Sequence, residues 1–182
     1  MNSRIVLTSV FWITLVLSVK GLGAASLLEQ QAEHKEAQSE SSHADHETMM
    51  SRGQQGMGFS QTKTTHHFLL KPDGGVIRVS ANDPKDVTSR EQIRMHLTHI
   101  AHAFAQGDFD IPMFVHDQVP PGVPVMKRLS KEIDYQFRKN DSGGEVVIHS
   151  NSAEALRAIH DFLAFQIREH KTGDSEAVSS TQ

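Results

Sequence analysis

Two stretches of this chain carry the same order of local signals: an extended segment, a Gly-Gly turn, a second extended segment and a capped helix. The first stretch has them at residues 64–70, 71–75, 76–81 and 88–106, and the second at 133–139, 140–144, 145–149 and from 151 or 152 to 173. Paired glycines between two β-rich runs are typical of a hairpin turn. The pattern predicts an α+β fold, with a four-stranded antiparallel sheet, two main helices on one face and a ββα pseudo-repeat.

Both predicted helices have an apolar stripe at helical spacing and recognisable end signals. In the first helix, Thr88 and Glu91 match a capping box, and Gly107 is a natural stop. The last helix starts after Asn151 or Ser152. The two stripes, expected to face the sheet, are Ile93, Leu97, Ile100 and Phe104, and Leu156, Ile159, Leu163 and Ile167.

A long connection, residues 108–124, separates the two units and is apolar for a loop. It is expected to pack against the domain, and Pro124 can occupy the first turn of a short helix that runs to about residue 131. Long ordered loops often carry function, so this segment is a place to look for a site.

The N-terminus resembles a secretory signal peptide. Arg4 precedes an apolar run that ends near Val19, and small residues follow up to Ser26. The run is about 15 residues, shorter than the roughly 20 that a bilayer-spanning helix needs, although an uncleaved anchor remains the alternative. We expect a signal peptide at 1–25, a flexible leader containing His and Met at 26–62, the domain at 63–174 and a disordered tail at 175–182. The protein would then be periplasmic or secreted, with membrane contact only through the signal segment.

Composition narrows the functional classes. The chain has no Cys, so a packed core rather than disulfides must stabilise it, and any soft-metal site must use Met and His. Its net charge of −4 argues against a nucleic-acid partner. There is no Gly-x-Ser-x-Gly elbow, and the Gly-Gly pairs precede strands rather than the helix that a phosphate loop requires. An enzyme is therefore less favoured than a binding protein.

Twelve histidines make metal binding the first functional hypothesis. A helical i, i+3 pair and a strand His-His pair are the main sources of imidazole, with a further His and two Met on or near the long connection. The candidate ligands are His66, His67, His96, His99, His116, Met113 and Met126. Since neighbouring strand residues point to opposite faces, only one of His66 and His67 can join the helical pair. Imidazoles suit zinc or copper, and thioethers shift the preference toward Cu⁺.

The alternative hypothesis is a metal-free module that binds a protein or peptide, such as a periplasmic partner. It would use the apolar segment 111–125 together with Phe162 and Phe165, which lie off the stripe of the last helix. Those two rings otherwise pack beneath the long connection.

Four motifs resemble those of an uncharacterised family of small exported bacterial proteins. They are Thr-Thr-His-His-Phe at 64–68, His-Leu-x-His-Ile-Ala at 96–101, Pro-Pro-Gly-Val-Pro-Val-Met at 120–126 and Phe-Gln-Ile-x-x-His-x-Thr-Gly-Asp at 165–174. The resemblance covers about residues 57–174 and implies a shared compact domain and a bacterial source, but no mechanism. Some members carry an aspartate carbamoyltransferase label. This sequence does not support that activity, since it lacks the Ser-Thr-Arg-Thr-Arg phosphate motif and is about half the length of such two-domain enzymes.

Overall fold

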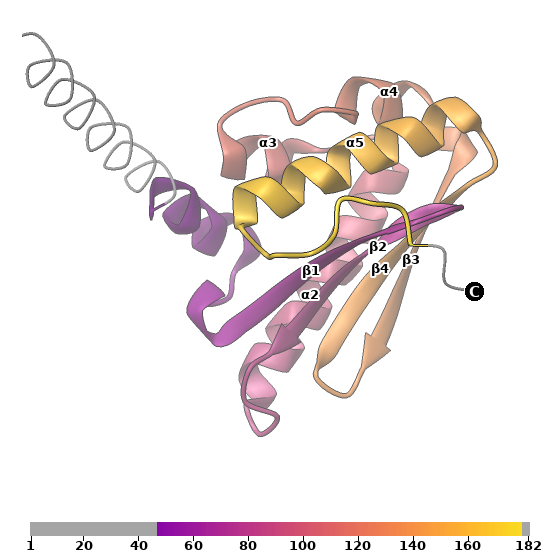
Figure 1. Cartoon of the computed structure of the whole chain (residues 1–182). Coiled ribbons are helices and arrows are strands. Elements are labelled where there is room, and N and C mark those ends of the chain that lie inside the picture. The colour runs from indigo at the N-terminus through magenta and orange to yellow at the C-terminus, as the bar shows by residue number, and fades with distance from the viewer. Residues whose placement is uncertain (1–46, 180–182) are drawn as a thin grey trace, which may run out of the picture. The chain divides into compact units, whose positions relative to one another are not determined.

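The computed structural model describes residues 47–179, so the predicted signal peptide and most of the predicted leader lie outside the described residues. Four strands form one antiparallel sheet in the order β1-β2-β4-β3 (Figure 1). The strands are β1 (Thr64–Lys71), β2 (Gly74–Ala81), β3 (Ile133–Asn140) and β4 (Gly143–Ser150). The α+β class and the four-stranded antiparallel sheet predicted from the sequence are confirmed.

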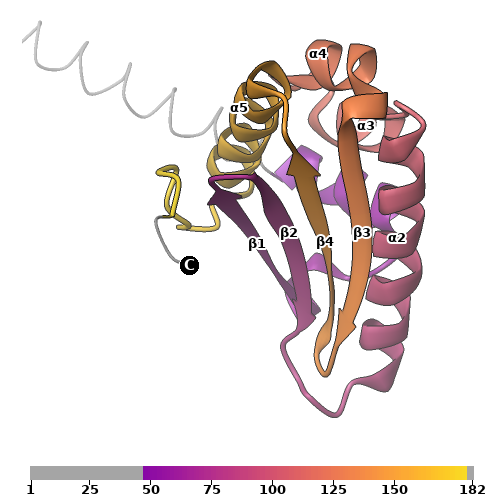
Figure 2. The ribbon, with the colours of Figure 1, turned by 90° about the vertical axis from the view of Figure 1, so that its right-hand side faces the viewer.

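Two long helices, α2 (Val87–Ala105) and α5 (Ala153–His170), pack on one face of this sheet (Figure 2). The register places alternate residues of each strand on that face, where they join the stripes of both helices in one apolar core. Val79, Val146, Ile93 and Leu163 are each at most 1% exposed there.

Each of the two long helices packs mainly on the strands of the other ββα unit. Helix α2 follows the first hairpin but packs mainly on β4 and β3, whereas α5 follows the second hairpin and packs mainly on β1 and β2. The turn glycines also correspond. A Cβ on Gly74 would lie 2.0 Å from the Ile148 carbonyl oxygen, and one on Gly143 would lie 2.4 Å from the Val79 carbonyl oxygen. Each hairpin therefore needs glycine where its turn approaches the other unit.

The start of α2 differs from the prediction. Asp86, not Thr88, is the N-cap, because its carboxylate accepts hydrogen bonds from the Ser89 amide (2.9 Å) and hydroxyl (2.8 Å). The predicted capping-box partner Glu91 pairs with Arg94 instead. Ser152 caps α5, one of the two residues expected.

The connection between the units contains more helix than expected. Helix α3 (Asp110–His116) precedes the short helix α4 (Val123–Arg128), which has Pro124 in its first turn as predicted. Asp108 accepts a hydrogen bond from the Asp110 amide (2.9 Å) and so supports the start of α3. Phe109 is fully buried, so the connection packs on the domain.

Both flanks of the predicted domain are more ordered than the sequence suggested. Residues 47–57 are helical, and Met49 and Phe59 are buried, so the folded part begins before residue 63. In the predicted tail, the Ser179 amide and hydroxyl both donate to the Leu70 carbonyl oxygen at 3.0 Å. Among the described residues, no helix combines the length and apolarity needed to cross a membrane.

Candidate functional site

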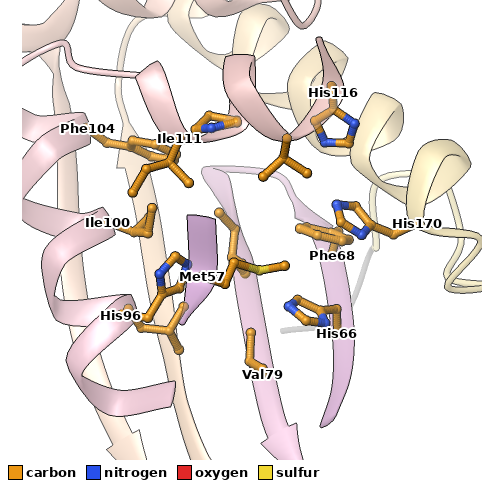
Figure 3. Close-up of a pocket in the computed structure, with 14 residues that line it drawn as sticks. Met57, His66, Phe68, Val79, His96, Ile100, Phe104, Ile111, His116 and His170 are labelled. Atoms are coloured by element: carbon orange, nitrogen blue, oxygen red, sulfur yellow. The ribbon is translucent and has the colours of Figure 1, made fainter. Parts of the chain in front are cut away.

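A small cavity of about 60 Å³ lies between the helices and the sheet, beneath α3. Most of the residues that line it are apolar, and four are histidines from four different elements. They are His66 in β1, His96 in α2, His116 in α3 and His170 in α5. Figure 3 shows His66, His170 and His116 along one side of the pocket, His96 across from them and Met57 between.

Local periodicity explains why these histidines point inward. On β1, His66 alternates with Phe68 and Leu70, which are buried against the helices. His116 and His170 are the last residues of their helices, α3 and α5. Both helices end in a left-handed residue, which turns the chain away immediately after the imidazole.

The imidazoles form a continuous series of ring contacts with Phe59. His96 meets Phe59 edge-on at a centroid distance of 5.5 Å, and Phe59 stacks on His66 at 5.9 Å. His66 stacks on His170 at 5.7 Å, and His170 meets His116 at 5.1 Å with the ring planes nearly perpendicular. The rings therefore follow the wall of the pocket rather than converging on a single point.

Burial keeps three of these imidazoles neutral. It lowers the pKa of His66 to about 4, with a smaller contribution from His67, and lowers the pKa of His96 to about 4, with smaller contributions from His66 and His99. Burial also lowers the pKa of His116, opposed by its hydrogen bond to Gln166. At neutral pH each of these three rings thus carries a lone pair and no charge.

Two imidazole nitrogens at the pocket are buried without a hydrogen-bond partner among the described residues, Nε2 of His66 and Nδ1 of His116. The other nitrogen of His116, Nε2, donates to the Gln166 side-chain oxygen at 2.9 Å. That bond requires the proton on Nε2, so the lone pair of the neutral ring is on Nδ1. Since buried polar atoms are usually paired, these two nitrogens indicate a place for a ligand.

The structure brings together three of the predicted ligands and separates the other four. His66, His96 and His116 line the pocket. His67 lies on the opposite face of β1, with its Nδ1 2.8 Å from Asp174, and His99 is exposed. The two predicted methionines pack in or against the apolar core, and neither lines the pocket: Met126 is fully buried and Met113 partly buried.

Two possible ligands at the pocket were not among the predicted ligands of the domain: His170, and Met57, which was considered only as part of a leader that could bind copper weakly without folding. His170 is in the last turn of α5, far along the chain from the other histidines, and no spacing rule links it to them. Met57 fell in the predicted leader, where neighbouring Gly and Gln residues favoured a flexible segment. Only the fold brings these two side chains into the pocket.

Among the described residues, no group of three or more His, Asp or Glu side chains is arranged to hold a metal ion. The exposed position of His99 is one reason, since it removes the third imidazole of the predicted set.

The exposed apolar surface expected for the protein- or peptide-binding hypothesis is smaller than predicted. Phe162 and Phe165 are buried, which leaves Phe114 and Val119 as the large exposed apolar residues of segment 111–125.

No family model, curated protein or solved structure matches this chain. The fold and the site define it as an α+β protein with an apolar, histidine-lined pocket. Its function must be inferred from that pocket.

Proposed function

We propose that this protein is an exported binding protein that holds one cuprous ion in the histidine-lined pocket. The observation that carries the proposal is Nδ1 of His116, which is buried without a hydrogen-bond partner among the described residues in a ring beside His170. Neutral imidazole is a good ligand for copper, and the Gln166 bond to His116 is the kind of outer hydrogen bond that orients a metal-binding histidine.

The size of the pocket favours an ion over an organic ligand. Its volume is about 60 Å³. An apolar cavity that binds benzene is about 150 Å³. The pocket therefore has room for an ion or a few waters, but not for a ring-sized molecule unless side chains move.

The lining favours a singly charged, soft ion. The described residues around the pocket supply imidazoles and the Met57 thioether, and none of them is a carboxylate. A buried divalent ion would find no carboxylate ligand among these lining residues, and its desolvation would be costly. Structural Zn²⁺ usually takes four ligands, whereas thioether and imidazole together suit Cu⁺. Copper is thus favoured over zinc, the other metal considered from the sequence.

His116 and His170 are the best-placed pair of ligands. Their ring centroids are 5.1 Å apart. Two imidazoles that share an ion at metal–nitrogen distances near 2 Å have centroids roughly 5–6 Å apart. Met57 supplies a third ligand by side-chain rotation, which gives a set of two imidazoles and one thioether.

The test is an anaerobic competition between the purified protein and bicinchoninate for Cu⁺. We expect one ion per chain and at least a tenfold weaker affinity in His116→Gln. The matched control, His99→Gln, removes an exposed histidine and should bind like the wild type. Absence of competition by the wild type, or equal affinities in His116→Gln and the wild type, would overturn the proposal. In the second case, copper would be bound by another part of the chain.

A further inference from the structure

A second cavity lies beside the first and shares two of its imidazoles. Its volume is about 250 Å³, and His66 and His170 line both cavities. The remaining lining of this outer cavity is mainly polar, including Thr64, Gln61 and Lys171, with Met50 as its thioether. The two stacked rings thus form a shared wall between a small apolar pocket and a larger polar one.

We propose that the outer cavity is the entrance through which Cu⁺ reaches the inner pocket, and that the Met50 thioether is its first ligand. This inference rests on the proposed function. The ion would pass from Met50 to the shared imidazoles and then to His116, while remaining Cu⁺ throughout. Each step exchanges one ligand for another at a constant oxidation state, so no electron needs to move.

The arrangement of the rings supports such a path. The successive centroid distances from His66 to His170 and from His170 to His116 are 5.7 and 5.1 Å. The His66 and His170 rings are nearly parallel and imidazole lone pairs lie in the ring plane, so one of these rings must rotate for a new bond to form before the previous one breaks. A path without them would require a bare ion to cross an apolar space, at a large desolvation cost.

The position of Met50 also suits an entry ligand. Its side chain is partly buried at the cavity, and its carbonyl oxygen accepts a hydrogen bond from the Gln61 side chain at 2.9 Å. That bond ties the helical segment 47–57 to the turn before β1. The thioether is therefore held beside His66 and His170 by its backbone, while its own torsions stay adaptable.

Lys171 places a positive side chain at the same cavity. It would oppose the approach of a free cation and favour an anionic complex that carries Cu⁺. An anionic bicinchoninate complex of Cu⁺ is therefore a suitable probe of loading.

The experiment follows the transfer of Cu⁺ from that complex to the whole protein by anaerobic stopped-flow absorbance. We expect Met50→Leu and Met50→Gln to slow transfer at least tenfold, while the equilibrium affinity changes less than threefold. Met95→Leu is the matched control, because Met95 is 66% exposed on α2 and lies outside both cavities. Its transfer rate should equal that of the wild type.

Two results would contradict the proposal that Cu⁺ enters through the outer cavity with Met50 as its first ligand. Wild-type transfer rates in both Met50 variants would show that the ion enters elsewhere. Equal losses of rate and affinity would make Met50 a permanent ligand of the bound ion rather than an entry ligand. Failure of the proposed function is a different outcome, since the wild type itself would then take no copper at equilibrium.

Discussion

Gln166 determines which nitrogen of His116 carries the lone pair. Its side-chain oxygen accepts from Nε2 of His116, while the Gln166 amide nitrogen is buried without a partner among the described residues. Gln166→Leu would remove the acceptor but keep a side chain of similar size. Because an outer hydrogen bond of this kind is typically worth 10–100-fold in metal affinity, we expect Cu⁺ binding to weaken at least about tenfold.

Bicinchoninate competition measures this effect, with Gln136→Leu as the matched control. Gln136 is exposed on β3 and hydrogen-bonds to Asp134. If Gln166→Leu bound Cu⁺ as tightly as the control, Gln166 would have no role in orienting His116.

The different positions of His96 and His99 follow from helical geometry alone. At about 100° per residue, His96 lies about 70° from the centre of the apolar stripe and His99 about 130° from it. In the structure, His96 is partly buried and His99 is exposed. The angular position of each histidine on the helix is therefore a better predictor than the i, i+3 spacing of which one reaches the pocket. Spacing shows that two side chains are neighbours, but it does not show that both face inward.

At the scale of elements, the segment after α5 covers the outer edge of β1. Asp174 accepts hydrogen bonds from the Phe68 amide (2.9 Å) and the Thr172 hydroxyl (2.7 Å), and it pairs with His67. Further along the same strand, the Ser179 amide donates a hydrogen bond to the Leu70 carbonyl oxygen. Exposed edge strands invite pairing with other chains, so this segment protects the sheet.

We expect Asp174→Ala to lower the free energy of unfolding by about 2 kcal/mol at pH 7, since hydrogen bonds to a charged group are among the stronger ones. Burial opposes the charge of Asp174, but the Phe68, Thr172 and His67 bonds outweigh it and lower its pKa. A carboxyl with a lowered pKa stabilises the fold above its ordinary pKa, and this contribution is lost as the pH falls. The effect of Asp174→Ala should therefore shrink near pH 3.

Urea denaturation at the two pH values tests this expectation. Glu176→Ala is the control, because the Arg168–Glu176 pair is exposed and should contribute little. Equal effects of the two substitutions would mean that Asp174 does not hold the segment in place.

Helical segment 47–57 and the residues after it are folded, although their composition predicts a flexible segment. Polar residues and Gly outnumber apolar residues in this stretch, yet two widely spaced apolar residues, Met49 and Phe59, are buried. Hydrophobicity averaged over a window of residues does not detect two isolated buried side chains of this kind. Their effect depends on the cavity that the helices and sheet leave open for them.

Phe59 gives a direct test of this part of the fold, because it contacts both His66 and His96. We expect Phe59→Ala to lower the free energy of unfolding by about 3–5 kcal/mol, as for other buried aromatic residues. Phe114→Ala, at a residue 49% exposed, is the control and should cost much less. Similar losses in urea denaturation would mean that the segment is only loosely attached.

At the scale of the whole molecule, the sequence predicted the hairpins, the sheet and the two covering helices. Turn glycines and apolar periods are local signals, and each unit repeats them. The site was less accessible to prediction, because His170 and Met57 reach it only through packing of the last helix and the first segment. His66 and His96 were predictable, since strand alternation and helical angle limit where they can point.

Burying these imidazoles makes the stability of the whole fold depend on pH. His66 and His96 have an ordinary pKa of 6.5 that the fold lowers to about 4. Between those values the unfolded chain takes up protons that the folded chain cannot, so stability falls as the pH drops. Above 6.5 both states are neutral, and below about 4 both are protonated, so the loss levels off at each end.

For the metal-free protein, we expect urea denaturation to show a loss of about 1–3 kcal/mol per buried histidine between pH 7 and pH 4.5. Among the described residues, the charged neighbours that shift these two pKa values are other imidazoles, His67 for His66, and His66 and His99 for His96. His96→Gln should reduce the loss by about half, while His99→Gln, one turn along the same helix, should keep it. A stability that stays constant between pH 7 and pH 4.5 would place these imidazoles in water, and the pocket that they line would then be open rather than buried.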